Sequence, residues 1–117
     1  MKNTESLKRN YEFARAYKKG RQYKSKNIKL YVLDGERQKR RLGITVSRKA
    51  YGRSVDRNRV RRLVRESYRE LENNIIRNTD MVFVVRKNTE LPVFSEIRKE
   101  TEILLKQSGL IIDSEQT

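Results

Sequence analysis

Apolar residues recur with the period of an α-helix between residues 54 and 75. The positions that repeat every three or four residues are Val60, Leu63, Val64, Ser67, Leu71 and Ile75. This spacing places them on one face of a helix and predicts that this face packs against the rest of the protein. Ser54 is the expected N-cap, since its hydroxyl can accept a free backbone N–H, and the helix is expected to run to about Asn74.

Shorter periods predict strands elsewhere in the chain. In residues 27–33 and 42–48, apolar residues alternate with polar or small ones, which is typical of half-buried strands. Residues 80–86 contain five consecutive apolar residues, which indicates a buried central strand. Residues 21–25 are a candidate for a further short strand. The polar segment 34–41 predicts a hairpin connection between the first two strands.

Two shorter helices are predicted near the two ends of the chain. The first runs from Tyr11 to Lys19 with Asn10 as its N-cap, and Gly20 is expected to end it in the left-handed conformation. The second spans about residues 95–108, and Gly109 ends it.

The predicted order is therefore helix, strand, strand, helix, strand, helix. This order favours an α+β sandwich in which helices cover a mostly buried central sheet. The length of 117 residues is typical of one domain, so residues 1–117 are interpreted as a single domain. The polar segments 1–9 and 113–117 are expected to be loose tails.

Charge indicates what this domain binds. The chain has 29 Lys and Arg against 15 Asp and Glu, a net charge of +14. Residues 37–69 hold thirteen basic residues and two acidic ones, whereas residues 88–117 are net acidic. Such an imbalance predicts attraction to nucleic acid or to an anionic membrane surface.

Several classes of protein are disfavoured by what the sequence lacks. Without cysteine there is no disulfide framework and no thiolate metal site, and without histidine the commonest general base and zinc ligand are missing. No apolar run reaches the length of a membrane span, and the N-terminus has no signal-peptide core. The expected location is the cytoplasm.

A basic stripe runs beside the apolar face of the long helix. It consists of Arg57, Arg61, Arg65 and Arg69, widened by Asn58 and Arg62. Like charges four residues apart destabilise a helix by roughly 0.2 to 0.5 kcal/mol per pair, so the stripe costs on the order of 1 kcal/mol. A solubilising surface is the simpler interpretation. A bound polyanion that balances the charge is the alternative, and arginine suits bidentate phosphate recognition.

Aromatic residues mark a second candidate surface. Phe13 and Tyr17 lie on one face of the first helix, and Tyr31 shares a strand face with Lys29. These aromatic rings are either ordinary core packing or a platform on which nucleic-acid bases stack.

Taken together, these segments resemble the protein subunit of bacterial ribonuclease P. Its signature is a basic helix with an Arg-Asn-Arg core followed by paired basic residues, here GRSVDRNRVRRLVRE over residues 52–66. The preceding strand, RLGITVSRK over residues 41–49, is similar to that of the family, as is Glu12-Phe13 followed by Tyr17 and Gly20. The resemblance extends from about Leu7 to Gly109.

The resemblance implies a fold detail and a function. The arginine-rich helix should form a left-handed crossover between parallel strands, although right-handed crossovers are the general rule. The protein should be the subunit of an endoribonuclease that removes the 5′ leader of precursor tRNA. Catalysis should reside in an RNA subunit that holds Mg²⁺ ions, and no catalytic or metal-binding residue is expected on the protein. The scattered carboxylates and the lack of histidine agree with this.

The resemblance also implies two binding surfaces on this chain. Residues expected to contact the catalytic RNA are Lys49, Arg53, Arg57, Asn58, Arg61, Arg62 and Arg65. Residues expected to line a cleft for the single-stranded leader are Phe13, Tyr17, Tyr31, Ser47 and Arg48. The chain departs from the family at Lys29, where an apolar residue is common, and in a turn before Gly52 that is one residue longer.

Three other functions fit parts of this pattern. A ribosomal or other structural RNA-binding protein would share the size and charge, but would not need the long arginine signature. An autonomous metal-dependent nuclease would need clustered carboxylates. A helix bound to a membrane surface would bury its apolar face in the bilayer, whereas the apolar face of this arginine-rich helix has a sheet to cover.

Overall fold

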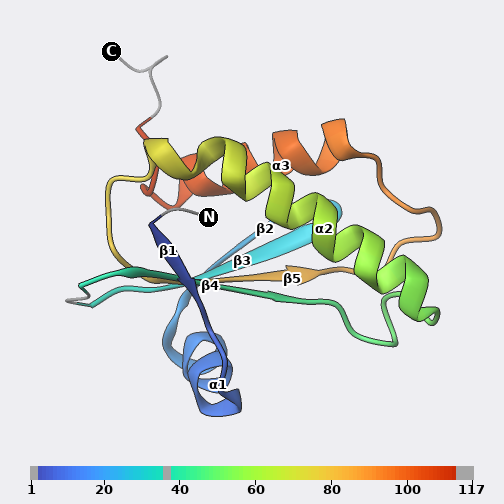
Figure 1. Cartoon of the computed structure of the whole chain (residues 1–117), viewed down its shortest axis with the longest axis horizontal. Helices are drawn as coiled ribbons and strands as arrows, with labels where there is room; N and C mark the ends of the chain where they lie inside the picture. The colour runs from blue at the N-terminus through green and yellow to red at the C-terminus, as the bar shows by residue number, and fades with distance from the viewer. Residues whose placement is uncertain (1–2, 36–37, 113–117) are drawn as a thin grey trace.

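The computed structural model describes residues 3–35 and 38–112, and these hold one sheet of five strands and three α-helices (Figure 1). In chain order the elements are β1 (Thr4–Ser6), α1 (Asn10–Lys19), β2 (Arg21–Lys24), β3 (Ile28–Leu33), β4 (Arg40–Thr45), α2 (Ser54–Leu71), the 3₁₀ turn η1 (Glu72–Asn74), β5 (Asp80–Val85) and α3 (Phe94–Gln107). The predicted α+β class and the predicted order are confirmed. The candidate strand at 21–25 is present as β2, and β1 is an additional strand.

The sheet has the strand order β1-β4-β5-β3-β2. β5 is the central strand, as its apolar run predicted, and it pairs antiparallel with β3 and parallel with β4. The predicted hairpin between the strands at 27–33 and 42–48 is therefore wrong, because β5 lies between them. Five of the six residues of β5 are buried, so this strand needs a neighbour on both edges and a cover on both faces.

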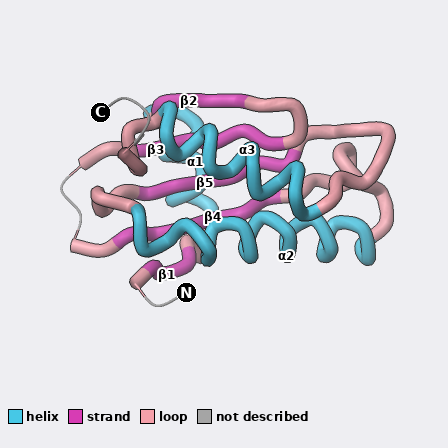
Figure 2. Tube along the Cα trace, turned by 90° about the horizontal axis from the view of Figure 1, so that it is seen from above, coloured by secondary structure: helices cyan, strands magenta, loops and turns pink. Residues whose placement is uncertain are grey.

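α2 connects the parallel strands β4 and β5 and crosses the face of the sheet (Figure 1). Figure 2 views the sheet from the side of α2, with β4 and β5 running from left to right and β5 placed above β4. If the strands are turned to run upward, β5 lies to the left of β4. This is the left-handed crossover that the family resemblance implied.

The helices cover the two faces of the sheet unequally. α2 and α3 lie on one face and α1 lies on the other (Figure 1). The larger core lies under α2 and α3, where Val60, Val64 and Tyr68 are fully buried against the apolar side of the strands. Each such side chain contributes roughly 1.5 to 3 kcal/mol when it leaves water. The apolar face predicted for α2 is confirmed, and Tyr68 also belongs to this face.

The N-terminal segment is not loose where the structure describes it. β1 pairs in parallel with β4, and Leu7 is buried beside α1. The Thr4 hydroxyl donates to the buried carboxylate of Glu72 at 2.5 Å and lies 2.7 Å from the Tyr68 hydroxyl. The prediction of a loose arm over residues 1–9 is thus wrong for Thr4–Ser6. The predicted tail at 113–117 lies outside the described residues.

Helix ends differ from the predictions by one residue or by conformation. The N-cap positions are Arg9 and Arg53, so Asn10 and Ser54 are already the first helical residues. Gly20 is extended, with φ −75° and ψ 155°, because the chain passes directly into β2. A Cβ atom at Gly20 would overlap the carbonyl oxygen of Ala16, so close approach rather than left-handed geometry requires glycine there.

Candidate nucleic-acid interfaces

Strand register arranges side chains in rows on the face of the sheet that carries α1. Side chains alternate between faces, and residues paired across strands share a face. The inner row consists of Gln22, Tyr31, Val82 and Gly43. The outer row consists of Lys24, Lys29, Val84 and Thr45. The two rows lie two residues apart along each strand.

α1 covers the inner row. Ala16 is fully buried in a cluster with Leu33 and Val82, and the Phe13 ring packs beside this cluster. The ring of Phe13 lies so close to Gly43 that a Cβ atom there would overlap it. Glycine at this strand position therefore makes room for the aromatic ring.

The last turn of α1 places Tyr17 at the boundary between the two rows. Its ring meets that of Tyr31 edge to face, with centroids 5.1 Å apart and an interplanar angle of 70°. The Tyr17 hydroxyl lies 3.3 Å from the hydroxyl of Thr45. Tyr17 is 40% exposed, so the pair is held in place without being buried. We call Tyr17, Tyr31 and the outer row the aromatic–lysine surface.

The structure brings together three of the five residues predicted to bind the leader. Phe13, Tyr17 and Tyr31 gather on one side of the sheet, with Phe13 the most engaged in packing. Ser47 and Arg48 lie in the exposed turn that follows β4. The Ser47 hydroxyl accepts the Ala50 backbone N–H at 3.1 Å, so this side chain also shapes the turn.

The residues predicted to contact the catalytic RNA lie along the outward side of α2 and in the turn before it. Arg57 donates to the carbonyl oxygens of Tyr51 and Gly52 at 3.0 and 2.7 Å, which ties this turn to the helix. Arg61 donates to the Asn58 side chain at 2.9 Å. Part of the predicted binding set therefore also holds local structure.

The other members of this set point more freely toward solvent. Arg53 is highly exposed and only loosely paired with Asp56, at 3.9 Å. Lys49, Arg62 and Arg65 are exposed, and none of them forms a hydrogen bond or ion pair with another described residue. These guanidinium and ammonium groups are available for phosphate contacts.

Arg65 also connects the two predicted surfaces. It lines a small cavity of about 130 Å³ together with Phe13, Gly43 and Ile44. β1 pairs with only the first half of β4, so this cavity lies where the edge of β4 continues beyond β1. The basic face of α2 and the aromatic residues of α1 thus approach the same edge of the sheet.

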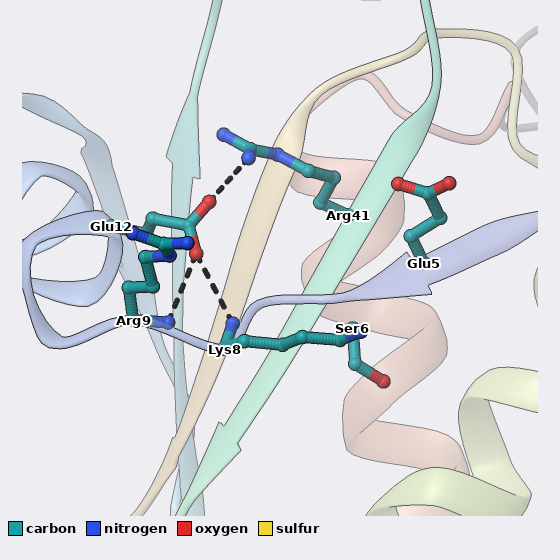
Figure 3. A pocket seen from close by; sticks show the side chains of 6 residues that line it. All are labelled: Glu5, Ser6, Lys8, Arg9, Glu12 and Arg41. Atoms are coloured by element: carbon teal, nitrogen blue, oxygen red, sulfur yellow. Dashed lines mark hydrogen bonds and ion pairs between the residues drawn. The ribbon is translucent and has the colours of Figure 1, made fainter.

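An ion-pair network anchors the start of α1. The Glu12 carboxylate accepts the backbone N–H groups of Arg9 and Lys8 and pairs with Arg41, and these contacts lower the pKa of Glu12 below its ordinary value. Arg41 also donates through Nε to the fully buried Asp80 at 2.7 Å. Glu12 lines a cavity of about 500 Å³. The dashed lines in Figure 3 show the contacts that hold its carboxylate.

Neither this network nor any other part of the described chain offers a metal centre. Within residues 3–35 and 38–112, no group of three or more acidic side chains is placed to hold a metal ion. The carboxylates of Glu12 and Asp80 are engaged by arginine. Among the described side chains, none are grouped in a way that fits a protein-bound Mg²⁺ site.

Sequence reasoning missed two kinds of contributor. Lys24 and Thr45 join the aromatic–lysine surface only through strand register, which depends on the sheet order and not on any local pattern. Glu12 had a usable signal, because a glutamate three residues after an N-cap commonly accepts backbone N–H groups at a helix start.

Comparison with known proteins decides the family. The model of the ribonuclease P family matches residues 1–109. The chain belongs to the ribonuclease P protein family. The ribonuclease P protein component of Clostridium novyi (strain NT) is 40% identical over 112 residues, which cover 94% of this chain and 98% of that protein.

Solved structures of the ribonuclease P family agree with this assignment. The RNase P protein of Staphylococcus aureus is similar with a TM-score of 0.80 at 29% identity, covering 91% of this chain and 96% of that one. The RNase P protein of Thermotoga maritima gives a TM-score of 0.77 at 29% identity, covering 88% and 96%.

The family resemblance drawn from the arginine signature is confirmed. Ribonuclease P is an endoribonuclease that matures the 5′ end of tRNA, and this chain is its protein subunit, with ribonuclease P RNA as its partner. This decides against a ribosomal or other structural RNA-binding role. As to a membrane, no helix among the described residues is long and apolar enough to cross a bilayer.

Proposed function

We propose that this subunit assists ribonuclease P by binding two RNAs on two surfaces. The aromatic–lysine surface binds the single-stranded 5′ leader of precursor tRNA, and the outward side of α2 binds the catalytic RNA. The observation that carries the proposal is that α1 ends over the boundary between the rows. It leaves an aromatic pair beside the outer row, in which Lys24 is exposed and Lys29 is half-buried.

The chemistry of this surface suits a single strand. Bases stack on aromatic rings whatever their sequence, and nearby cations hold the phosphates. Tyr17 and Tyr31 supply the rings, and Lys29 lies two residues from Tyr31 on the same face. Arg48 is exposed in the turn that follows β4, so it adds positive charge at the end of that strand.

The chemistry of α2 suits a structured RNA. Arg62 and Arg65 have no partner among the described residues, and guanidinium groups recognise phosphates with two parallel hydrogen bonds. A phosphate-rich partner would offset the like-charge repulsion along the stripe. Arg57, which is tied to Tyr51 and Gly52, positions the turn that carries Lys49 and Arg53 beside this face.

We place the hydrolysis itself on the RNA. The described part of the chain has no acidic cluster for two metal ions, so Mg²⁺ is expected to be held mainly by the RNA subunit. The protein then binds the leader, fixes the substrate and screens phosphate repulsion so that the RNA retains its ions at lower Mg²⁺. The cytoplasm is the expected location.

Reconstitution tests this function. Purified protein is combined with a bacterial ribonuclease P RNA, and leader release from precursor tRNA is followed at low Mg²⁺ against RNA alone. Strong stimulation that requires the leader supports the proposal. Tight RNA binding without stimulation would contradict it. Specific cleavage by the protein without RNA would overturn the assignment of catalysis to the RNA.

A matched set of three variants sharpens this test. Arg62→Ala and Arg65→Ala remove free charges from α2, whereas Lys99→Ala removes one exposed charge from α3. Stimulation at low Mg²⁺ should fall for the first two variants and stay at the wild-type level for the third. Equal losses for all three would mean that only total charge matters.

A further inference from the structure

Lys24 and Lys29 are directly opposite each other on the neighbouring strands β2 and β3. Side chains of such a pair lie on one face within contact distance, and like charges in this position destabilise a sheet. Neither lysine forms an ion pair or hydrogen bond with another described residue.

Protection of the sheet edge explains only one of these lysines. β2 is an edge strand, and lysine on an edge strand discourages pairing with other chains. Lys29, however, lies on the inner strand β3 and is half-buried, with Val84 of the central strand on its other side. Protecting the exposed edge of the sheet from pairing with other chains does not require a charge on this inner strand.

The position of the pair relative to the aromatic rings suggests its partner. Lys29 and Tyr31 are two residues apart on one strand face, about 7 Å along the strand. This distance is comparable to the step between successive phosphates in an extended single strand. In the outer row, Lys24 is exposed and Lys29 is half-buried, so the end of this row that carries the two lysines is accessible to a bound chain.

We propose that Lys24 and Lys29 form a phosphate clamp that holds the leader backbone beyond the bases stacked on Tyr17 and Tyr31. The inference rests on the leader-binding function proposed above and adds a determinant of leader length to it. A leader that is too short to reach β2 gains affinity from base stacking alone. A longer leader places a phosphate between the two ammonium groups and relieves their mutual repulsion.

The test uses the enzyme reconstituted from the full-length protein and ribonuclease P RNA. Precursor tRNAs carry leaders of graded length up to roughly ten nucleotides, a range that spans a typical single-strand site. Variants Lys24→Met, Lys29→Met and the double variant keep the side-chain stem and remove the charge. Lys99→Met, on the opposite face of the sheet, is the matched control.

With wild-type protein, affinity should rise in a step once the leader is long enough to reach the clamp. The double variant should lose this step, weakening binding of long leaders roughly fivefold while short leaders bind normally. The slope of log affinity against log salt should become shallower by about 0.7 for each lost phosphate contact. Lys29→Arg should retain most of the step, and the melting temperature should not fall in any variant.

Three results would overturn the clamp, and they are distinguishable. If the double variant follows wild type at every leader length and salt concentration, the lysines do not hold the leader, although leader binding itself stands. If wild-type affinity is independent of the leader altogether, the leader-binding function fails and the clamp fails with it. A loss equal to that of Lys99→Met would also contradict a specific clamp.

Discussion

The ring of Tyr17 in α1 meets the ring of Tyr31 in β3 edge to face, with centroids 5.1 Å apart. One ring comes from the end of a helix and the other from the sheet beneath it, so each holds the other at the boundary of the covered surface. Such pairs contribute roughly 0.5 to 1.5 kcal/mol beyond the area that they bury. Tyr17 is 40% exposed, so the pair remains accessible to a base.

Removing either ring should weaken binding of precursor tRNA more than it weakens the fold. Tyr17→Ala and Tyr31→Ala are expected to cost about 1 to 3 kcal/mol of leader-dependent affinity, with little change in salt slope, because stacking is not ionic. Tyr17→Phe should bind nearly as wild type, since it loses only the contact with Thr45. Equilibrium binding of precursor and mature tRNA measures this.

Tyr11→Ala is the matched control for the tyrosine pair. Tyr11 lies in the same helix and is 59% exposed, but it makes no aromatic contact among the described residues. Its removal should leave affinity for precursor tRNA unchanged. A loss equal to that of Tyr17→Ala would contradict a specific stacking site.

Phe13 should behave differently, because its ring packs against the cluster under α1 and fits over Gly43. Phe13→Ala is expected to lower the free energy of unfolding by about 3 kcal/mol, near the low end for an aromatic core residue, since it is only partly buried. Gly43→Ala should also destabilise the fold by displacing this ring. Chemical denaturation measures both, and an unchanged stability in Phe13→Ala would show that the ring serves binding alone.

The arginines of α2 divide into two groups with different expected phenotypes. Arg62→Ala or Arg65→Ala should flatten the salt dependence of binding to ribonuclease P RNA by about one unit each, with no loss of stability. Arg57→Ala should do the same and also lower the melting temperature, because it breaks the bonds to Tyr51 and Gly52. An unchanged slope for Arg62 or Arg65 would show that the side chain faces solvent in the complex.

Tyr68 gives a pH-dependent test of the buried contact with β1. Burial raises the pKa of Tyr68 to about 12, so the folded protein favours the neutral hydroxyl. The resulting stability is fully present below pH 10 and is lost as the pH rises from about 10 to about 12, because the unfolded chain ionises first. The loss is on the order of 2 to 3 kcal/mol.

Tyr68→Phe isolates this contribution. The variant should be less stable than wild type at neutral pH, since the hydroxyl contact with Thr4 is lost. Its stability should then fall less steeply above pH 10 than that of wild type. Denaturation midpoints at a series of pH values compare the two, and parallel curves would show that Tyr68 does not titrate with unfolding.

Local pattern predicted the elements whose burial repeats along the chain. The apolar face of α2 and the central position of β5 were confirmed, because a helix or strand buried on a sheet must repeat its apolar residues. β1 escaped prediction, since three residues carry no periodic signal. Its position depends on Glu72 and Tyr68, which lie more than sixty residues away in the sequence.

The candidate site was predictable only in part, for the same reason. Phe13 and Tyr17 follow from helix spacing, and Tyr31 follows from strand alternation. That Lys24 lies opposite Lys29 depends on the pairing of β2 with β3, and that Thr45 lies near Tyr17 depends on the position of β4 across β5. The incorrect hairpin prediction would have placed β3 directly beside β4 and given a different surface.

Site-specific cross-linking tests the division of labour between the two surfaces most directly. A photoreactive uridine placed in the leader of precursor tRNA is irradiated in the reconstituted enzyme, and the cross-linked peptides are identified by mass spectrometry. The account predicts cross-links to the last turn of α1 and to β2 and β3, the peptides that carry Tyr17, Lys24 and Tyr31. Cross-links confined to the arginine face of α2 would contradict it.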